Sequence, residues 1–302
     1  MKINRRHLSA LLSVLCMAVA VPASADVLSN VMTRKKIRVA TDMGIAPFGM
    51  LDGSMKPTGS DVEVARALAA DWGVELEFVN TTGPTRIPNL NTDKADVVIS
   101  SLSVTEERAK VIDFTKPYSF IRTTIIGSSK DPSVKDWSDL KGKSIAVVRT
   151  TMQDVELTPK ASALGFTVVR FDDDATAITA AVSGQATYLG LGDPQMRTIN
   201  QRIGSKSFEA KLVIKQFPIA MGVKKGEAAL MAKLNEWIST NAKNGKLNAI
   251  YKQYHEMERE MFTEIKDYEV EAFNSGSKSM KCRQIASGAA YVDDKGNWVE
   301  VH

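Results

Sequence analysis

Apolar positions in the first third of the chain switch between the spacing of strands and the spacing of helices. A short apolar run from Ile37 to Ala40 predicts a strand. Apolar residues between Val64 and Trp72 recur at helical spacing, and Ser60-Asp61-Val62-Glu63 predicts a capping box at the start of that helix. Residues 74–78 then alternate between apolar and acidic side chains, as a strand with one buried face does. This succession of strand and helix predicts an α/β fold with parallel sheets.

The same alternation returns after Tyr118, which predicts a boundary there and a second α/β unit beyond it. A helix is expected near residues 175–183, and strands are expected at 121–127, 144–148, 166–171, 188–191 and 217–223. Two amphipathic helices, near 228–244 and 246–254, lead into a C-terminal extension from about residue 256. Within that extension, residues 291–299 predict a hairpin around a polar turn.

The first 25 residues have the pattern of a cleavable signal peptide. A basic start is followed by an apolar stretch from Leu8 to Ala20 and by the small-x-small site Ala23-Ser24-Ala25, which predicts cleavage before Asp26. The apolar stretch is shorter than the roughly 20 residues that a membrane-spanning helix needs. Cys16 follows Leu15, where a lipoprotein signal has a small residue, so no lipid anchor is expected. The sequence therefore predicts a periplasmic protein secreted through the general route.

Charge and composition narrow the possible functions of the mature chain. Removing the three basic residues of the signal peptide from 39 leaves 36 Lys and Arg against 35 Asp and Glu. This balance lacks the basic excess typical of nucleic-acid-binding proteins. Cys282 is the one cysteine after Asp26, so an intrachain disulfide is excluded. His255 and His302 are the two remaining histidines, which leaves little for histidine-based catalysis. We expect no metal, cofactor or catalytic residue.

An ordered set of motifs runs from Ile37 to about Tyr254. Its members are Gly59–Ala69, Trp72–Phe78, Arg86–Pro88, Asp96–Ser100, Thr105–Arg108, Asp113–Tyr118 and Asp139–Lys143. In this order and spacing they resemble the polar amino-acid-binding proteins of ABC importers, family 3 of the extracellular solute-binding proteins. Each motif alone is weak, whereas the ordered set is specific.

The resemblance implies a type II periplasmic-binding-protein fold, in which two crossover strands join two α/β lobes. Lobe 1 is then expected to comprise residues 26–122 plus 218–302, and lobe 2 residues 123–217. A small amino-acid-like ligand is expected in the cleft between the lobes, which close on it by a hinge. The expected partner is the membrane permease of an ABC transporter, and the protein is expected to be a monomer.

The resemblance also implies which lobe 1 residues bind the ligand. Arg108 falls where the family has the arginine that clamps the ligand α-carboxylate. A planar guanidinium suits that role, since its paired donors fit a carboxylate. Ser101 and Ser103, and more weakly Ser100, fall where the family contacts the α-ammonium and the carboxylate. The alternatives are a surface arginine at a helix start and ordinary loop serines.

Lobe 2 departs from the family pattern in two places. Thr150 and Met152 replace a glycine and a threonine of the usual loop, although backbone amides near Thr151 and Met152 still predict a carboxylate contact. Asp193 is the candidate partner of the ligand ammonium, one residue later than the commonest position. The alternative for Asp193 is a turn or helix-capping role before Pro194.

The residues that select the ligand side chain leave the ligand open. Arg86 falls where binders of acidic amino acids have a second arginine, and Asp42 falls where binders of basic amino acids have an acid. The alternative is that the two pair with each other. Ile45 and Gly83 replace the aromatic clamps of many relatives, and Phe48 in the loop after the first strand completes the predicted ligand site.

Two other functions are compatible with this fold. A periplasmic dehydratase of prephenate-like acids needs a carboxyl group as general acid in the cleft, for which Asp42 and Asp193 are the candidates. A sensory binding protein would dock on a receptor instead of an importer.

Overall fold

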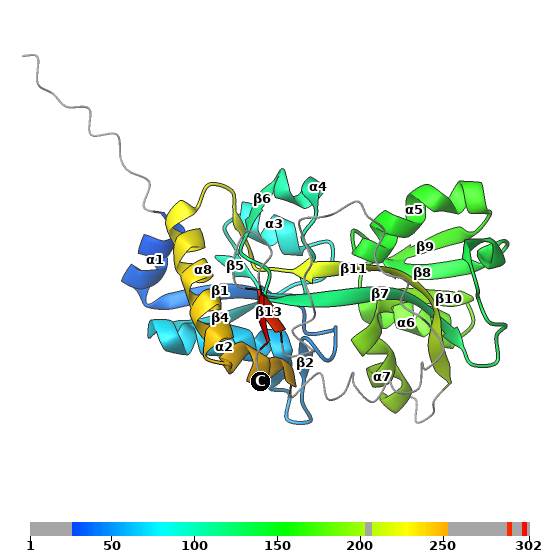
Figure 1. Cartoon of the computed structure of the whole chain (residues 1–302), viewed down its shortest axis with the longest axis horizontal. Coiled ribbons are helices and arrows are strands. Elements are labelled where there is room, and N and C mark those ends of the chain that lie inside the picture. The colour runs from blue at the N-terminus through cyan, green and yellow to red at the C-terminus, as the bar shows by residue number, and fades with distance from the viewer. Residues whose placement is uncertain (1–25, 203–206, 253–288, 292–297, 301–302) are drawn as a thin grey trace, which may run out of the picture.

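The chain folds into two α/β lobes that lie side by side along the long axis of the molecule (Figure 1). The computed structural model describes residues 26–202, 207–252, 289–291 and 298–300. The predicted signal peptide and its cleavage site lie outside the described residues, as does most of the extension. No helix within these described ranges is long and apolar enough to cross a membrane.

Lobe 1 is built on a five-stranded sheet. Its strand order is β4 (Glu75–Asn80), β1 (Lys36–Thr41), β5 (Val97–Val98), β12 (Gly222–Lys224) and β6 (Ile112–Phe114). β1 pairs in parallel with β4 and β5, whereas β12 runs antiparallel to β5 and β6. The helices of this lobe include α1 (Val27–Arg34), α2 (Ser60–Trp72), α3 (Arg86–Asn91), α4 (Glu106–Ala109) and α8 (Ala228–Lys243). β2 (Met50–Leu51) and β3 (Pro57–Thr58) form a small hairpin.

Lobe 2 has a second five-stranded sheet. Its strand order is β11 (Phe208–Ile219), β7 (Ser119–Ser128), β10 (Tyr188–Gly192), β8 (Ser144–Val148) and β9 (Thr167–Phe171). β8 pairs in parallel with both β9 and β10, as the buried apolar runs predict. Three helices, α5 (Met152–Leu164), α6 (Asp174–Val182) and α7 (Asp193–Arg202), and a 3-10 helix, η1 (Trp137–Leu140), belong to this lobe.

Two long strands, β7 and β11, connect the lobes. They pair antiparallel from Ser119–Ile219 to Ser128–Phe208 and run from one lobe into the other (Figure 1). The predicted lobe limits, after residues 122 and 217, fall inside these strands and stay a prediction. The single strand predicted at 217–223 is wrong, because β11 ends at Ile219 and β12 starts at Gly222 in the other sheet. Between them, the Ala220 amide donates to the Leu102 carbonyl, which turns the chain from one sheet to the other.

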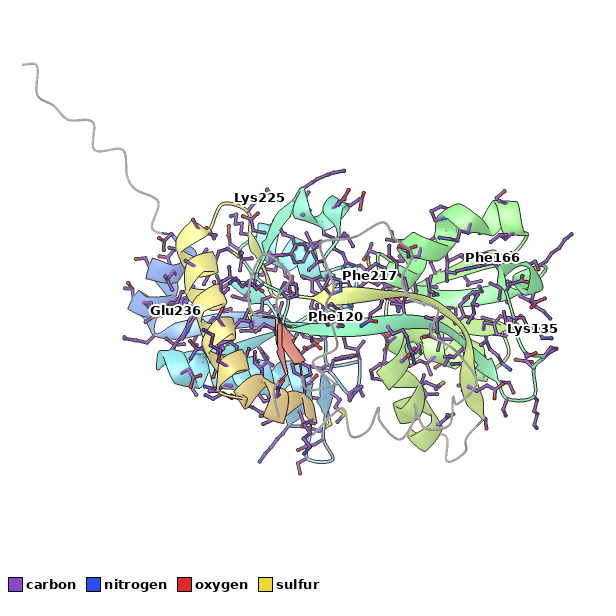
Figure 2. The ribbon with its side chains drawn as sticks, in the orientation of Figure 1. Phe120, Lys135, Phe166, Phe217, Lys225 and Glu236 are labelled. Atoms are coloured by element: carbon purple, nitrogen blue, oxygen red, sulfur yellow. The ribbon has the colours of Figure 1, made fainter. Side chains whose placement is uncertain are left out.

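Each lobe is stabilised by apolar cores of its own. In lobe 1, α2 and α8 bury Leu68, Leu230 and Leu234 against the sheet. Each such side chain contributes about 1.5–3 kcal/mol by leaving water. Figure 2 shows Phe166 in lobe 2, where it is buried, and Phe217 on the crossover strand, where it joins the lobe 1 core.

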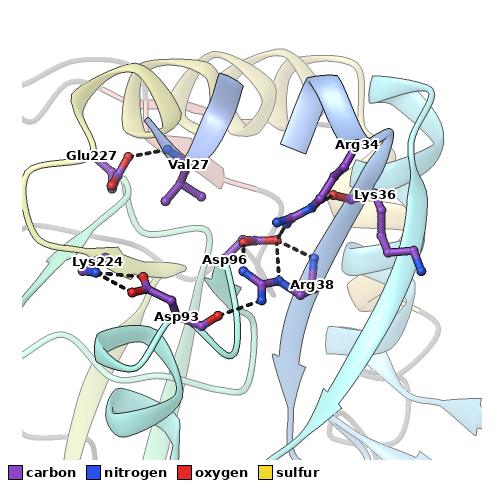
Figure 3. A network of polar contacts seen from close by, with 8 residues as sticks. All are labelled: Val27, Arg34, Lys36, Arg38, Asp93, Asp96, Lys224 and Glu227. Atoms are coloured by element: carbon purple, nitrogen blue, oxygen red, sulfur yellow. Dashed lines mark hydrogen bonds and ion pairs between the residues drawn. The ribbon is translucent and has the colours of Figure 1, made fainter. Parts of the chain in front are cut away.

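A buried carboxylate ties the base of lobe 1 together (Figure 3). Asp96 accepts hydrogen bonds from the Arg38 amide at 2.7 Å and from Arg38 Nη2 at 2.8 Å, and it also pairs with Arg34 of α1. Nearby, Lys224 of β12 pairs with Asp93 at 2.7 Å, and Glu227 accepts from the Val27 amide at 2.9 Å. These contacts join the N-terminal helix, β1 and the returning chain, which are distant in sequence.

The start of α2 differs from the predicted capping box. Gly59 is the N-cap, with φ of 124°, and no side-chain cap is formed. A side chain at Gly59 would lie 2.3 Å from the Phe48 carbonyl oxygen, so only glycine fits this close approach. The amides of Ser60 and Asp61 donate instead to carbonyls of the Pro47-Phe48 loop. The helix start is thus held by the loop that follows β1 rather than by Ser60.

Other local predictions are confirmed. Thr105 caps α4 by accepting from the Arg108 amide, and Gly73 ends α2 in the left-handed conformation. The predicted terminal hairpin is present as β13 (Ala289–Tyr291) paired antiparallel with β14 (Trp298–Glu300).

Candidate ligand-binding cleft

A polar cavity lies between the lobes and is lined from both sides. Its empty space is about 480 Å³, including the part open to solvent. Six of the predicted site residues line it: Arg86, Ser101, Ser103, Arg108, Thr151 and Met152. Four predicted site residues are not among its lining: Asp42, Phe48, Ser100 and Asp193. Lining residues that the sequence did not single out include Thr123, Gln153, Asp174 and Gln195.

Arg108 reaches from lobe 1 to lobe 2. Its Nη1 donates to the Ser103 carbonyl and its Nη2 to the Thr150 carbonyl, both at 2.8 Å. Burial in the cleft, and then the nearby Arg86, lower the pKa of Arg108 to about 9, so the guanidinium is charged at neutral pH. Within the described part of the chain, no carboxylate pairs with Arg108. A partly desolvated cation without a counterion favours the binding of an anion.

Arg86 provides a second buried cation at the start of α3. It is 6% exposed, its Nη1 donates to the Ser100 carbonyl at 3.0 Å, and its Nε has no hydrogen-bond partner. No hydrogen bond or ion pair joins Arg86 to Asp42 among the described residues, so the direct pair considered from the sequence is absent there. Burial raises the pKa of Asp42, and the charge of Arg86 opposes that rise.

The serine loop is held by a buried acid, Asp61. Its carboxylate accepts from the Ser101 amide at 2.7 Å, and Ser101 has a φ of 41°, which is uncommon for a residue with a side chain. Burial raises the pKa of Asp61 to about 7. The Ser101 amide is therefore already hydrogen-bonded, and Ser101 is one of the cavity-lining residues. Asp61 lies 40 residues earlier, so the sequence alone offered no signal for this contact.

Ser100 and Phe48 are buried and are not among the cavity-lining residues. The Ser100 hydroxyl accepts from the Asp42 amide at 3.1 Å, and Ser100 is fully buried. Phe48 packs in the lobe 1 core, and its carbonyl accepts from the Asp61 amide. Their predicted ligand contacts stay predictions, since neither residue is among those that line the cavity.

In lobe 2, Thr150 occupies the position before α5 at which the family resemblance implied a glycine. Thr150 adopts a φ of 60°, the left-handed conformation in which glycine is favoured, and its amide donates to Asp154 at 3.0 Å. The Thr151 hydroxyl donates to the Val148 carbonyl, so it does not cap the helix. Met152 and Gln153, the first two residues of α5, line the cavity, and a helix start favours a negative group nearby.

Asp193 points toward a crossover strand. Its carboxylate accepts hydrogen bonds from Arg122 Nε and from the Thr124 hydroxyl, both on β7, and it is 4% exposed. β10 ends one residue earlier, at Gly192, where a side chain would lie 2.5 Å from Ile121. The predicted contact of Asp193 with a ligand ammonium stays a prediction.

Asp174 is an acidic lining residue that the sequence did not reveal. Its Oδ1 accepts from Gln195 Nε2 at 2.8 Å, and Gln195 Oε1 accepts from the Gly192 amide at 2.9 Å. Burial first, and then the charge of Asp42, raise the pKa of Asp174 to about 6. In the sequence it follows Asp172 and Asp173, and this acidic run before a helix is typical of capping. Asp173 is indeed the N-cap of α6.

The two lobes are in close contact around this cavity. A side chain at Gly83 in lobe 1 would lie 3.1 Å from Val148 Cγ1 and 3.2 Å from the Arg149 carbonyl oxygen in lobe 2. Together with the contact of Arg108 to Thr150, this close approach closes one side of the cleft. The absence of an aromatic side chain at position 83 is what permits it.

Comparisons with known proteins agree with this architecture. The family model of the bacterial extracellular solute-binding proteins, family 3, matches residues 37–257. A probable amino-acid ABC transporter-binding protein of Haemophilus influenzae is 28% identical over 237 residues, which cover 75% of this chain and 87% of that protein.

Two solved structures extend the comparison. An ancestral arginine-binding protein bound to arginine has a TM-score of 0.70 and 28% identity, with 73% of this chain and 98% of that chain covered. An ancestral amino acid-binding protein, a precursor of cyclohexadienyl dehydratase, has a TM-score of 0.67 and 29% identity, with 75% and 98% covered. The predicted type II periplasmic-binding-protein fold is thereby confirmed. The chain belongs to the bacterial extracellular solute-binding proteins of family 3.

Proposed function

We propose that this protein is the substrate-binding component of an amino-acid ABC importer, and that it holds an amino acid or a close derivative between its lobes. The observation that carries the proposal is Arg108, a charged and partly desolvated group that reaches across the cleft without a carboxylate partner among the described residues. The relative from Haemophilus influenzae, a probable amino-acid ABC transporter-binding protein, supports the transport role.

In this proposal the ligand α-carboxylate binds Arg108, with the Ser103 region and the first amides of α5 as further donors. Charge-assisted hydrogen bonds of this kind contribute about 1.5–3 kcal/mol each. Because Arg108 belongs to lobe 1 and α5 to lobe 2, one carboxylate contacts both lobes. The ligand then favours the closed arrangement, which is the state that a permease distinguishes from the open one.

Arg86 is proposed to contact the ligand side chain. Its buried Nε has no hydrogen-bond partner and its side chain lines the cavity, so it offers a free donor to an acidic or amide group. Ser101 is proposed to place its hydroxyl toward the ligand from the same side.

Isothermal titration calorimetry of the mature protein with the twenty standard L-amino acids and L-cystine tests the function. The protein is first unfolded and refolded to remove any carried ligand. We expect at least one of these compounds to bind, with a carboxylate-free analogue, the corresponding amine, binding far more weakly. If none of them binds the refolded protein, the proposed function is wrong.

Location and processing form part of the same proposal. The mature protein is proposed to begin at Asp26 in the periplasm, without lipid, and to act as a monomer that docks on a permease. Intact-mass measurement of protein purified from the periplasm checks this. A mass that includes a diacylglyceryl group on Cys16 contradicts it.

A dehydratase of prephenate-like acids is the second candidate. The similarity to a precursor of cyclohexadienyl dehydratase favours it, as does the partly buried acid Asp174 at the cavity. Incubation with prephenate and with arogenate, followed by detection of phenylpyruvate or phenylalanine, separates the two candidates. If the wild type converts either compound and Asp174→Asn does not, the protein is a dehydratase and the proposed binding role is wrong.

A further inference from the structure

The ligand's positive charge needs a carboxylate, and Asp193 is already occupied. Both of its oxygens accept hydrogen bonds from β7, one from Arg122 and one from Thr124, and Asp193 is not among the cavity-lining residues. β7 is one of the two strands that connect the lobes. Asp193 therefore fixes the first turn of α7 to a crossover strand within lobe 2.

Asp174, unlike Asp193, borders the cavity. It lines the cavity at the first turn of α6, and its Oδ1 is held by Gln195 at 2.8 Å. Gln195 is itself fixed by the Gly192 amide, so the end of β10 and the start of α7 together position the carboxylate. Among the described residues, no cationic side chain forms an ion pair with Asp174.

The charged groups near Asp174 are compatible with a bound cation. Burial is the main cause of the raised pKa of Asp174; Asp42 from lobe 1 and the neighbouring Asp173 raise it further, whereas Gln195 and Arg86 lower it. Arg86 lines the same cavity, is 6% exposed and has an Nε without a hydrogen-bond partner, so this buried cation is incompletely satisfied. A ligand that carries both a cation and an anion satisfies the carboxylates and the arginines at once.

We propose that Asp174, positioned by Gln195, binds the cationic nitrogen of the ligand, and that Asp193 instead braces α7 against the crossover strand β7. This inference rests on the proposed function, because it requires a ligand with an ammonium or guanidinium group. That nitrogen comes either from the α-ammonium or from a basic side chain, and the experiment distinguishes the two sources.

The test compares three conservative variants with the wild type: Asp174→Asn, Asp193→Asn and Asp136→Asn. Asp136 is the matched control, since it is an exposed helix cap in lobe 2 and asparagine also caps helices. Each protein is titrated with L-glutamate, L-glutamine, L-lysine and L-arginine, with any other amino acid that binds the wild type, and with the deaminated partners glutarate, glutaramate, 6-aminohexanoate and 5-guanidinopentanoate.

We expect Asp174→Asn to weaken binding of the preferred amino acid by about tenfold or more, since one lost charged contact is worth at least ~1.4 kcal/mol. Asp193→Asn and Asp136→Asn should stay within threefold of the wild type. If the α-ammonium is the partner, deaminated compounds should bind the wild type and Asp174→Asn equally weakly. If a side-chain cation is the partner, Asp174→Asn should also lose affinity for 6-aminohexanoate or 5-guanidinopentanoate.

A measurement on the protein without ligand separately tests whether Asp193 holds α7 against β7. Asp193→Asn should lower the melting temperature of the free protein by about 5 °C or more, because a buried pair is broken, whereas Asp174→Asn should not lower it. If Asp174→Asn and the wild type bind the preferred amino acid with equal affinity, the proposed ligand role of Asp174 is wrong. If Asp193→Asn melts at the same temperature as the wild type, the proposed structural role of Asp193 is wrong. If no amino acid binds the wild type, the proposed function and the ligand role fall together, while the melting temperatures still decide the brace.

Discussion

The two lobes meet the cleft with different chemistry. Lobe 1 presents two arginines, Arg86 and Arg108, each oriented by backbone carbonyls of the serine loop. Lobe 2 presents a helix start, an amide side chain and the carboxylate of Asp174. The cations of lobe 1 are held by main-chain atoms, whereas Asp174 is held by the side chain of Gln195. Lobe 1 therefore brings two positive charges to the cavity, whereas lobe 2 brings the negative charge of Asp174.

Both lobes also contain a buried acid that pairs with arginine for structural reasons. In lobe 1, Asp96 joins Arg34, Arg38 and the amide of Arg38. In lobe 2, Asp193 joins Arg122 and Thr124. Neither acid is among the cavity-lining residues, so substitutions there should change stability before they change ligand binding.

The largest effect is expected for Asp96→Ala. Removing this acid leaves Arg34 and Arg38 without their partner and should lower the free energy of unfolding by about 3 kcal/mol. Urea denaturation followed by tryptophan fluorescence measures it. Lys36→Ala is the control, because its bridges to Glu75 and Glu77 are exposed and such bridges contribute about 0–1 kcal/mol. An Asp96→Ala loss no larger than that of Lys36→Ala contradicts the role given to this network.

Arg108→Ala should weaken binding of the preferred amino acid by about a hundredfold or more, because a buried charged partner is lost. Arg108→Lys should restore only part of the affinity, since an ammonium lacks the planar paired donors. Calorimetry at neutral pH gives both values. Arg66→Ala, which removes an exposed arginine of lobe 1 paired with Glu63, is the matched control and should bind as the wild type does. Binding by a folded Arg108→Ala within a few-fold of the wild type would show that the site is elsewhere.

Acidification should weaken ligand binding through Asp174. Its pKa in the free protein is raised to about 6, so the carboxylate that a cation needs is mostly ionised at pH 8 and mostly protonated at pH 5. Burial makes the largest contribution to this pKa, and the neighbouring groups that act on it are Asp42, Gln195, Arg86 and Asp173. We expect about a tenfold loss of affinity from pH 8 to pH 5, one pKa unit being a factor of ten. The Asp174→Asn variant should show a much flatter profile, and an equally steep one assigns the titration to another group.

The stability of the free protein should change with pH in the opposite sense. A carboxyl whose folded-state pKa is raised from 3.8 to about 6 binds protons more readily when folded. Its burial therefore costs stability above pH 6, and that cost is relieved as the pH falls from 6 toward 4. Asp174→Asn should remove this contribution, which a comparison of melting temperatures at pH 5 and pH 7.5 measures.

The smallest expected effect is a change in the ranking of ligands by affinity. Arg86→Ala should lower affinity for L-glutamate and L-glutamine several-fold more than for other amino acids, because Arg86 lines the cavity and has a donor without a partner. Asp42→Ala should alter the ranking less, since its side chain is occupied by the Gly44 amide and is not among the cavity-lining residues. A thermal-shift panel compares the two. A ranking preserved in Arg86→Ala, together with lower stability, makes Arg86 a purely structural residue.

The sequence by itself was enough to predict the α/β class, the family resemblance and the placement of Arg108 after Thr105. These features depend on contacts within a few residues, such as the Thr105 cap on the Arg108 amide, and local patterns report such contacts. The strand at 188–191 and the terminal hairpin were predictable for the same reason. Arg86 and the serine loop could be assigned to the cleft because a motif with fixed spacing includes them.

Only the tertiary structure decided which acids line the cavity. Asp193 turns toward Arg122, 71 residues earlier, while Asp174 is held in the cavity by Gln195, 21 residues later. The start of α2 and the change of sheet between β11 and β12 depend likewise on carbonyls of Phe48 and Leu102. Each outcome is set by a hydrogen-bond partner that becomes close only when the sheets assemble. The spacing of residues within one segment does not indicate which residue from elsewhere in the chain will lie close to it in the folded protein.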